Sequence, residues 1–238
     1  MRIALIGYGK MGRTIEEIAL QKGHSTGLII DIDSTGHFTK ENLDRCDVAI
    51  EFTGPGSAKG NIIRCLESGI PVVCGSTGWL KDWDEVVGCC NNNKGSFLYA
   101  SNFSVGVNLF FALNKQLARM MSKQEEYEVQ LDEIHHTQKK DSPSGTAITL
   151  AEQVMKEIHR KKNWVNHPSL NPSELTIISK RIDPDPGTHS VKYSSAIDDI
   201  EIIHTAHSRK GFAQGALMAA EYIRDKKGIF GISEVLGF

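Results

Sequence analysis

The residues best suited to chemistry lie between 133 and 147, in the order Glu-Ile-His-His-Thr-Gln-Lys-Lys-Asp-Ser-Pro-Ser-Gly-Thr-Ala. An imidazole such as that of His135 or His136, with an ordinary pKa of about 6.5, exchanges a proton near neutral pH. The lysine ammonium groups of the segment can neutralise a developing negative charge. Gly145 and Thr146 stand where an apolar helical pattern begins, so their first-turn N–H groups could hold a carboxylate. The segment therefore predicts a site for a small acidic substrate.

The first hundred residues alternate between strand and helix patterns. Short apolar runs predict strands at 3–6, 27–30, 48–52, 71–74 and 96–100, and amphipathic spacing predicts helices at 10–22, 58–68 and 79–91. Successive strand–helix units close by right-handed crossovers, which makes the strands parallel and covers both faces of their sheet. This part of the chain is therefore predicted to be an α/β domain.

A different pattern begins at residue 105. A long helical pattern at 105–125 is followed by period-two alternation at 127–131, 175–179, 190–193 and 201–204, with a loop at 163–173. Strands without intervening helices indicate an open mixed or antiparallel sheet. A last, alanine-rich helix at 211–224 is predicted to pack back onto the first domain.

These patterns divide the chain into two domains. Residues 1–104 with 210–238 are predicted to form a Rossmann-type parallel sheet completed by the C-terminal helix. Residues 105–209 are predicted to form an α+β domain with an open mixed sheet. The fold class is therefore α/β with a second, α+β domain.

Length and composition are those of an ordinary globular protein. The chain has 238 residues, 40% of them hydrophobic and 24% charged. Its formal net charge of −2 gives no reason to expect nucleic acid or an anionic membrane as a partner. Five cysteines without a C-x-x-C pair argue against a disulfide framework and a metal site. Because the opening apolar run is too short for a signal peptide and no stretch could span a bilayer, we expect a cytoplasmic protein.

The motif Gly7-Tyr8-Gly9-Lys10-Met11-Gly12 lies between the first predicted strand and the first predicted helix. In a dinucleotide-binding turn the first glycine allows the tight turn, the second lets the backbone approach a pyrophosphate, and the third lets helix and strand pack closely. Asp31 ends the second predicted strand and is placed to accept hydrogen bonds from the adenosine ribose. For the glycine motif alone, an empty structural turn is the alternative.

The residues around Asp31 favour NADH over NADPH. The Asp31 carboxylate would repel a 2′-phosphate, and Ile32 follows it where a basic residue would attract one. Lys10 and Arg13 lie near the glycine loop and could partly compensate. Asp33 is interpreted as a solvated turn carboxylate.

Two more loops follow predicted strands, at Glu51–Pro55 and at Gly75–Gly78. Ligands of open α/β sheets bind at the carboxyl ends of the strands. Gly75, Ser76 and Thr77 offer N–H groups and hydroxyls to a nicotinamide amide and its ribose. A purely structural turn is the alternative there.

With these motifs in one order, the chain resembles the 4-hydroxy-tetrahydrodipicolinate reductase family, long called dihydrodipicolinate reductase. The resemblance covers nearly the full length and is carried by Gly7–Gly12, Gly75–Gly78, Ala100–Asn108, His135–Ala147 and Ser208–Ala213. It implies the reduction of 4-hydroxy-tetrahydrodipicolinate to tetrahydrodipicolinate with NADH or NADPH, in the diaminopimelate route to lysine. It also implies a homotetramer built through the sheet of the second domain, which would bind the dicarboxylate substrate.

The resemblance also implies roles by matching position. His135 corresponds to a catalytic proton donor or acceptor and Lys139 to a second proton donor, while His136, Gly145 and Thr146 correspond to substrate contacts. The matching cofactor contacts are Gly7, Tyr8, Gly9, Lys10, Met11, Gly12, Asp31, Gly75, Ser76, Thr77, Ala100, Ser101, Asn102 and Phe103. No metal is expected, because a site made of His135, His136, Asp141 and His204 lacks supporting ligand spacing.

The chain departs from the usual family pattern in ways that affect the cofactor. The glycine loop is one residue shorter than in the commoner version, and Lys10 stands where an arginine is usual. Ile32 stands where an arginine often follows the ribose-binding acid. Ser142 replaces a usual alanine before Pro143, a change that we expect to be harmless.

Two other functions remain open on the sequence. An amino-acid dehydrogenase or another imine reductase could share the same plan, but it would not need the His135–Thr146 string. A non-enzymatic NADH sensor would need a DNA- or partner-binding appendage, for which the chain has no spare segment. His207 and Arg209 are predicted at the rim of the site, where Arg209 could assist a substrate carboxylate; a solvated position is the alternative.

Overall fold

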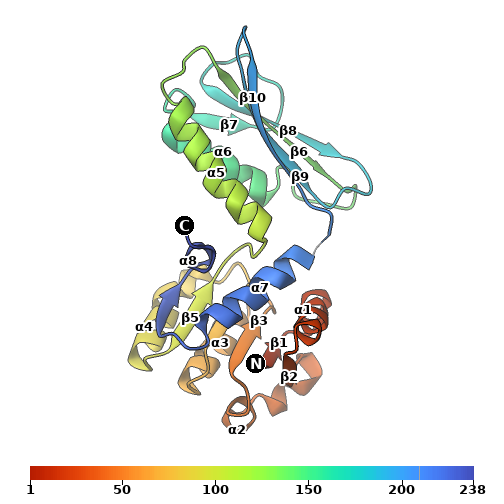
Figure 1. Ribbon diagram of the computed structural model, residues 1–238, viewed down its shortest axis with the longest axis vertical. Coiled ribbons are helices and arrows are strands. Elements are labelled where there is room, and N and C mark those ends of the chain that lie inside the picture. Colours follow the sequence, from red (N-terminus) through yellow and green to blue (C-terminus); the bar gives the residue numbers. More distant parts are fainter. Residues whose placement is uncertain (209) are drawn as a thin grey trace. The chain divides into compact units, whose positions relative to one another are not determined.

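The computed structural model describes residues 1–208 and 210–238, and the chain divides into two compact units. The first unit comprises Met1–Val105 and Lys210–Phe238, and the second comprises Gly106–Arg209. Each unit has its own sheet (Figure 1). Buried side chains of the described residues form two hydrophobic clusters in the first unit and one in the second. Among the described residues, no helix has the length and apolar character needed to cross a membrane.

The first unit alternates strands and helices along the chain. Its strands are β1 (Arg2–Ile6), β2 (Ser25–Ile30), β3 (Val48–Glu51), β4 (Val72–Cys74), β5 (Ser96–Tyr99) and β11 (Gly228–Phe230). Its α-helices are α1 (Lys10–Gln21), α2 (Lys40–Leu43), α3 (Ala58–Glu67), α4 (Trp83–Asn92), α7 (Lys210–Ile223) and α8 (Ile232–Leu236). Two short 3-10 helices are η1 (Ile32–His37) and η2 (Leu80–Asp82).

The strands of the first unit form a parallel sheet in the order β11-β5-β4-β3-β1-β2. The order turns around at β1, because β2 lies on one side of it and β3 on the other. Open α/β sheets bind their ligands in the crevice outside the carboxyl ends of the strands at such a point. The predicted Rossmann-type sheet is therefore confirmed.

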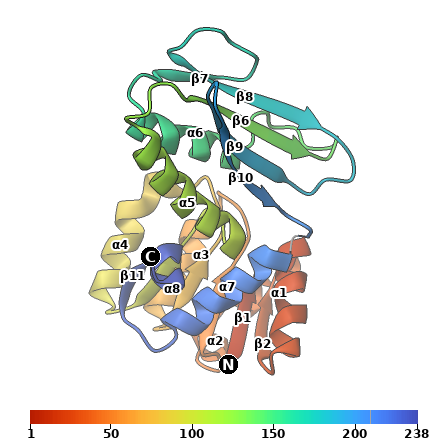
Figure 2. The ribbon, with the colours of Figure 1, turned by 45° about the horizontal axis from the view of Figure 1, so that its top comes forward.

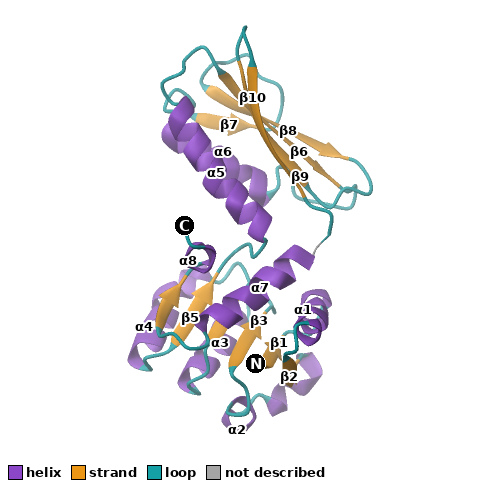
Figure 3. Cartoon of the chain, viewed as in Figure 1, coloured by secondary structure: helices purple, strands orange, loops and turns teal. Residues whose placement is uncertain are grey.

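Both faces of this sheet are covered by helices (Figure 3). Because successive side chains of a strand point to opposite faces, Ile3 and Leu5 of β1 pack with α1 and α7. Ala4 and Ile6 of β1 pack instead with α3 and α4. A strand covered on both sides is buried throughout, as β3 shows, and its one charged residue, Glu51, ends the strand with its carboxylate accepting from the amide of Thr53 at 3.1 Å.

The C-terminal segment completes the first unit with more than the predicted helix. α7 packs against α1 and β3, after which β11 pairs in parallel with β5 and α8 packs against α7. The prediction of a closing helix alone was thus incomplete. A run as short as Gly228–Phe230 has too few residues to reveal a period, and its pairing partner lies far back in the chain.

The second unit contains two helices and five strands in the part of the chain that the structure describes. These are α5 (Val105–Met121), β6 (Glu128–His135), α6 (Gly145–Glu157), β7 (Asn163–Val165), β8 (Glu174–Arg181), β9 (Thr188–Ser194) and β10 (Asp199–Thr205). The strand order is β10-β9-β6-β8-β7, with β6, β7 and β8 parallel and β9 antiparallel to both neighbours. The predicted mixed sheet is confirmed, whereas the loop predicted at 163–173 is wrong at its start, where β7 forms an edge strand.

Helices α5 and α6 pack against one face of this sheet (Figure 2). Val129 and Leu131 of β6 belong to the core under these helices, and Asn114 of α5 donates to the carbonyl of Leu150 in α6 at 3.1 Å. The strand period of two continues this face through Glu133 and His135. Strand β6 therefore directs two polar side chains onto its covered face.

Candidate active site

The glycine turn leads from β1 into α1 as the motif predicts. Gly7 has φ of +92°, a left-handed conformation that favours glycine. A methyl group on Gly7 would strike the carbonyl oxygen of Phe52, and one on Gly12 would strike the carbonyl oxygen of Gly7. A methyl group on Gly9 would meet no described atom within 4 Å. Packing therefore gives no reason for a glycine at position 9. The open space beside its backbone suits the close approach of a pyrophosphate.

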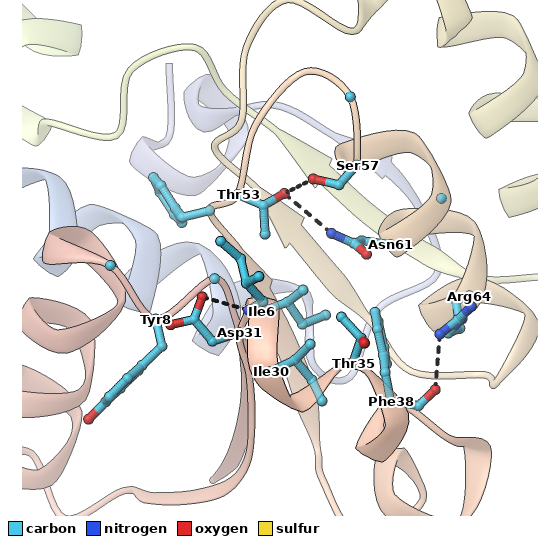
Figure 4. A pocket seen from close by; sticks show the side chains of 16 residues that line it. Ile6, Tyr8, Ile30, Asp31, Thr35, Phe38, Thr53, Ser57, Asn61 and Arg64 are labelled. Atoms are coloured by element: carbon cyan, nitrogen blue, oxygen red, sulfur yellow. Dashed lines mark hydrogen bonds between the residues drawn. The ribbon is translucent and has the colours of Figure 1, made fainter.

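A pocket of about 670 Å³ lies beside the glycine turn (Figure 4). Gly7, Tyr8 and Gly9 line it, together with Asp31, which follows β2 and caps η1. The Asp31 carboxylate accepts a hydrogen bond from the amide of Ile32 at 2.9 Å. Further polar lining comes from Thr53, Ser57, Asn61 and Arg64. The pocket thus offers backbone for a pyrophosphate and a carboxylate for ribose hydroxyls.

The other predicted residues of the glycine motif lie in the first turn of α1. Lys10 is exposed, Met11 packs against the core on the α1 and α7 side, and Gly12 is buried against Gly7. These three are not among the described residues that line the pocket. If these three residues contact the cofactor, they contact a part of it that lies outside this pocket.

The loops after β3, β4 and β5 lie together at the carboxyl ends of their strands. The amide of Thr53 donates to Oγ of Ser76 at 2.8 Å. A methyl group on Gly75 would strike the ring of Phe52, whose centroid lies 5.7 Å from that of Phe103. The remaining predicted residues of these loops are Thr77, Ala100, Ser101 and Asn102. The loop after β3 lines the 670 Å³ pocket through Phe52, Thr53 and Ser57, whereas the predicted residues of the loops after β4 and β5 are not among the described residues that line it.

In the second unit, the last residue of β6 is His135, whose side chain is buried. Its Nδ1 atom lies 3.4 Å from Oε2 of Glu133, and its ring meets that of His189 edge-on with centroids 5.0 Å apart. Burial lowers the pKa of His135 below its ordinary value, and the positive charges of Lys139 and Arg181 act in the same direction. The Glu133 carboxylate opposes this shift. The lowered pKa favours the uncharged form of the ring, which can accept a proton and later return it.

The Glu133 carboxylate is completely buried and contacts several elements at once. Both of its oxygens lie 3.1 Å from the amide nitrogen of Ser144, and Oε1 lies 3.3 Å from Arg181 Nη2. Oε2 lies 3.7 Å from Nε2 of His189. Burial alone would raise the pKa of Glu133, but hydrogen bonds from Ser144 and Ser179 outweigh it and keep the pKa below its ordinary value. A charged carboxylate therefore lies between the two imidazoles.

Ser144 caps the N-terminus of α6. Its hydroxyl oxygen accepts from the amide of Ala147 at 3.1 Å and also lies 3.1 Å from Nε2 of His189. The amides of Gly145 and Thr146 belong to the first turn, where donors have no intrahelical acceptor. The partial positive charge of this helix end favours a carboxylate ligand.

The loop after β6 carries Lys139 and His136. The Lys139 ammonium lies 2.8 and 2.9 Å from the two carboxylate oxygens of Asp141, and Arg181 donates to the carbonyl of Asp141 at 2.7 Å. The amide of His136 donates to the carbonyl of Asp185 at 2.8 Å. Arg181 thus connects Glu133 to the loop that carries Lys139. The predicted residues His135, His136, Lys139, Gly145 and Thr146 all belong to segments joined by this network.

Gly187 lies against the Nε2 and Cδ2 edge of the His135 ring. Its φ is +150°, and a methyl group there would lie 3.1 Å from Nε2 of His135. The Asp185 carboxylate accepts from the Gly187 amide at 2.7 Å and fixes the turn. Glycine at this position keeps the space beside Nε2 open.

Glu133, His135 and His189 place three possible metal-ligating atoms within 4.8 Å of one another in the described part of the chain. The carboxylate already accepts from the Ser144 amide and the Arg181 guanidinium. The positive charge of Arg181 opposes a metal cation at this position. We therefore interpret the cluster as a hydrogen-bonded network. His204, part of the alternative metal site considered above, packs instead beside the Phe110 ring.

Several residues of the network were not predicted from the sequence: Glu133, Ser144, Arg181, Asp185, Gly187 and His189. Glu133 had a recognisable signal, since it falls in the apolar register of β6 with Val129 and Leu131. Arg181 and His189 had no such signal in the sequence. They reach the site because β8 and β9, which are distant from β6 along the chain, pair with it. Of the two residues predicted at the rim, His207 is exposed and Arg209 lies outside the described residues.

Comparison with known proteins agrees with this arrangement of motifs. The family described as "Dihydrodipicolinate reductase, N-terminus" matches residues 1–103, and "Dihydrodipicolinate reductase, C-terminus" matches residues 106–236. A 4-hydroxy-tetrahydrodipicolinate reductase of Christiangramia forsetii is 50% identical over 236 residues, which cover 99% of this chain and 98% of that protein. One of Methanosarcina acetivorans is 32% identical over 240 residues, covering 99% and 89%.

A solved structure shares the fold. The dipicolinate-bound dihydrodipicolinate reductase of Paenisporosarcina sp. TG-14 has a TM-score of 0.77 at 20% identity, with 98% of each chain covered. The two family matches together span almost the whole sequence. The chain therefore belongs to the dihydrodipicolinate reductase family.

Proposed function

We propose that this protein reduces 4-hydroxy-tetrahydrodipicolinate to tetrahydrodipicolinate with a reduced nicotinamide dinucleotide, in the diaminopimelate route to lysine. Relatives at 50% and 32% identity carry the name of that reductase. The structural observation that supports the proposal most is the network joining His135, Lys139 and the start of α6. It brings together an imidazole that can exchange a proton, a cation and an anion site, which an imine dicarboxylate requires.

The chemistry explains the need for each group. The substrate loses water to give a conjugated C=C–C=N ring, and a reduced nicotinamide bound to the first unit would supply the hydride that the far carbon of this ring accepts. Negative charge then builds on the ring nitrogen, and the Lys139 ammonium neutralises it. His135 exchanges a proton through Nε2, beside Gly187. The amides of Gly145 and Thr146 hold one carboxylate, and His136 assists with the other.

We assign the dinucleotide to the first unit, with its adenosine end in the 670 Å³ pocket. Asp31 accepts from the ribose hydroxyls and repels a 2′-phosphate. Arg64 of α3 lines the same pocket, donates to the carbonyl of Phe38 at 3.2 Å and lies 4.9 Å from the centre of the Phe38 ring. Arg64 offers the positive charge that could attract a 2′-phosphate, whereas Ile32, the residue after Asp31, offers none. We therefore expect NADH to be preferred and NADPH to be accepted.

Asp31→Asn should lower the ratio of kcat/KM for NADH to kcat/KM for NADPH by about 10-fold, because it removes a negative charge that would face the 2′-phosphate. Steady-state rates with the two cofactors measure this ratio. Asp33→Asn is a matched control, since Asp33 lies in the first turn of η1, the short helix that Asp31 caps, but is not among the described pocket residues. An unchanged ratio in Asp31→Asn would contradict the assignment of the pocket.

We also propose that the second unit builds a homotetramer through the sheet face opposite α5 and α6. Cross-strand pairing places Ile178, Asp132, Ser190 and Ile203 in one row on this face, with Asp132 of β6 between Ile178 and Ser190. Ile134 lies on the same face, and the Ile203 side chain is 59% exposed. A sheet face that carries three isoleucines gains free energy when another subunit covers it.

Ile203→Glu should therefore reduce the assembly from four chains to two or one, because it places a charge in the apolar contact. Light scattering coupled to size-exclusion chromatography measures the mass. Leu170→Glu serves as the control, because Leu170 is fully exposed in the loop before β8 of the same unit. A tetramer that persists in Ile203→Glu would place the interface elsewhere.

The reaction itself is tested by absorbance at the reduced-nicotinamide band. Substrate is generated in place from pyruvate and aspartate semialdehyde by the preceding synthase, with NADH and NADPH in parallel. We expect oxidation that depends on the synthase. If protein that still binds NADH causes no oxidation, the reaction belongs to another imine or amino acid.

A further inference from the structure

Glu133 has no part in the reaction outlined above, although its carboxylate is the best-connected group of the network. The side chain is completely buried on the covered face of β6, two residues before His135. A buried carboxylate is costly unless several donors surround it. Its donors come from the start of α6 and from β8, so they are specific to this position in the fold.

The contact with His135 determines which ring nitrogen is available for chemistry. Nδ1 is the atom that faces Glu133, at 3.4 Å, and it makes no hydrogen bond with the described residues in this geometry. A carboxylate accepts but does not donate, so it favours the ring form that carries its proton on Nδ1. Nε2 then keeps its lone pair on the side of Gly187 and can exchange a proton there.

The contact with Ser144 determines where substrate would be held. The Ser144 amide points at both carboxylate oxygens of Glu133, and the next two residues supply the anion-binding amides of α6. Through Arg181, the same carboxylate is connected to the carbonyl of Asp141, whose side chain holds Lys139. One carboxylate is therefore common to the imidazole, the helix end and the ammonium loop.

We propose that Glu133 is a positioning residue that keeps His135 in its Nδ1-protonated form and fixes the ring relative to the start of α6. The role rests on the proposed function, because it concerns the residue that exchanges the substrate proton. Glu133 itself touches no reacting atom. Buried carboxylates that orient a catalytic imidazole act in this way in other enzymes.

The charges around His135 determine in which direction its pKa changes when the Glu133 charge is removed. Positive groups come from Lys139 in the loop and Arg181 of β8, and negative ones from Glu133 and from Asp185 in the turn after β8. Asp141 pairs with Lys139. His189 of β9 has its pKa lowered to about 4 by burial, so it is neutral at neutral pH, and His204 of β10 faces it. Without the Glu133 charge, burial and the two cations would lower the pKa of His135 further.

The test is the variant Glu133→Gln in the full-length protein, in which the side-chain oxygen can still accept from the Ser144 amide. NMR titration of the His135 ring should show a pKa lower by about one unit, and nitrogen chemical shifts should show loss of the Nδ1-protonated preference. The kcat should fall about 10- to 100-fold with little change in KM. The pH limb of kcat/KM that belongs to His135 should move to lower pH.

Glu152→Gln is the matched control, because Glu152 is an exposed carboxylate on α6 of the same unit. It should leave the His135 titration and kcat unchanged. Unfolding temperature and NADH affinity show whether Glu133→Gln keeps its structure. An unchanged His135 pKa, or a loss of kcat accompanied by equal losses of stability and NADH binding, would overturn the proposal. If the wild-type protein reduced no imine, the proposed function would fail, while the His135 titration would still decide the role of Glu133.

Discussion

Lys139→Ala should lower kcat by about 100- to 10,000-fold while the affinity for NADH stays the same. The Lys139 ammonium belongs to the network of the second unit, where it lies 2.8 Å from the Asp141 carboxylate. Lys139 is the group of the proposed mechanism that offers a fixed positive charge to the substrate ring nitrogen, because burial favours the uncharged form of His135. The dinucleotide pocket is built by residues of the first unit and should be unaffected. Single-turnover rates and NADH titration measure the two quantities.

Lys140→Ala is the control for this experiment. Lys140 is the next residue of the same loop and is exposed. Its removal changes the net charge by the same amount, so a similar loss of kcat in both variants would point to a general electrostatic effect. Nearly full activity in Lys139→Ala would remove Lys139 from the mechanism and leave cofactor binding as the only supported property of the site.

Gly9→Ala should raise the dissociation constant for NADH by about 10- to 100-fold, corresponding to about 1.4 to 2.7 kcal/mol of binding free energy. Gly9 precedes the first turn of α1 with an extended backbone that any residue can adopt, and an added methyl group would meet no described atom within 4 Å. The fold should therefore tolerate the change. The methyl group would instead occupy space that the pyrophosphate needs. Fluorescence titration with NADH measures the affinity.

Gly88→Ala provides the matched substitution. Gly88 lies inside α4 of the same unit, and a methyl group there also meets no described atom within 4 Å. Alanine in a helix interior should stabilise the unit by roughly 0.5 to 1 kcal/mol and leave NADH affinity unchanged. If Gly9→Ala binds NADH as tightly as the wild type, the glycine turn is structural and the dinucleotide lies elsewhere.

The parts of the fold that the sequence predicts are those in which local pattern and tertiary environment agree. The strand at Arg2–Ile6, its glycine turn and α1 follow from apolar runs, helical spacing and the left-handed Gly7. The start of α6 at Gly145 follows from the Ser-Gly-Thr step before an apolar helical pattern. The mixed character of the second sheet follows from alternation without intervening helices. These features depend on residues that are neighbours in the chain.

The unpredicted parts depend on residues distant in the chain. β7 and β11 are three residues long and are defined by pairing with β8 and β5, so they carry no period of their own. Arg181 and His189 reach Glu133 only because β8 and β9 flank β6. The turn at Gly187 is placed beside His135 by the same pairing. A pattern within one segment cannot show such contacts.

Glu133 could be predicted from the sequence only in part. Strand alternation already places it on the side of Val129 and Leu131, where a charge needs partners. The sequence therefore contained the fact that a buried carboxylate precedes His135, but not the identity of its donors. Ser144 and Arg181 become evident only in the folded unit.

The most direct test of the proposed reaction uses NADH in which both hydrogens at C4 of the nicotinamide are replaced by deuterium. Substrate is supplied by the preceding synthase, and the tetrahydrodipicolinate formed is analysed by mass spectrometry. The proposed reaction predicts a single deuterium on a ring carbon of the product, formed by the wild-type protein and not by Lys139→Ala. NADH oxidation that leaves the product without deuterium, or no product at all, would contradict direct reduction of the conjugated imine by this protein.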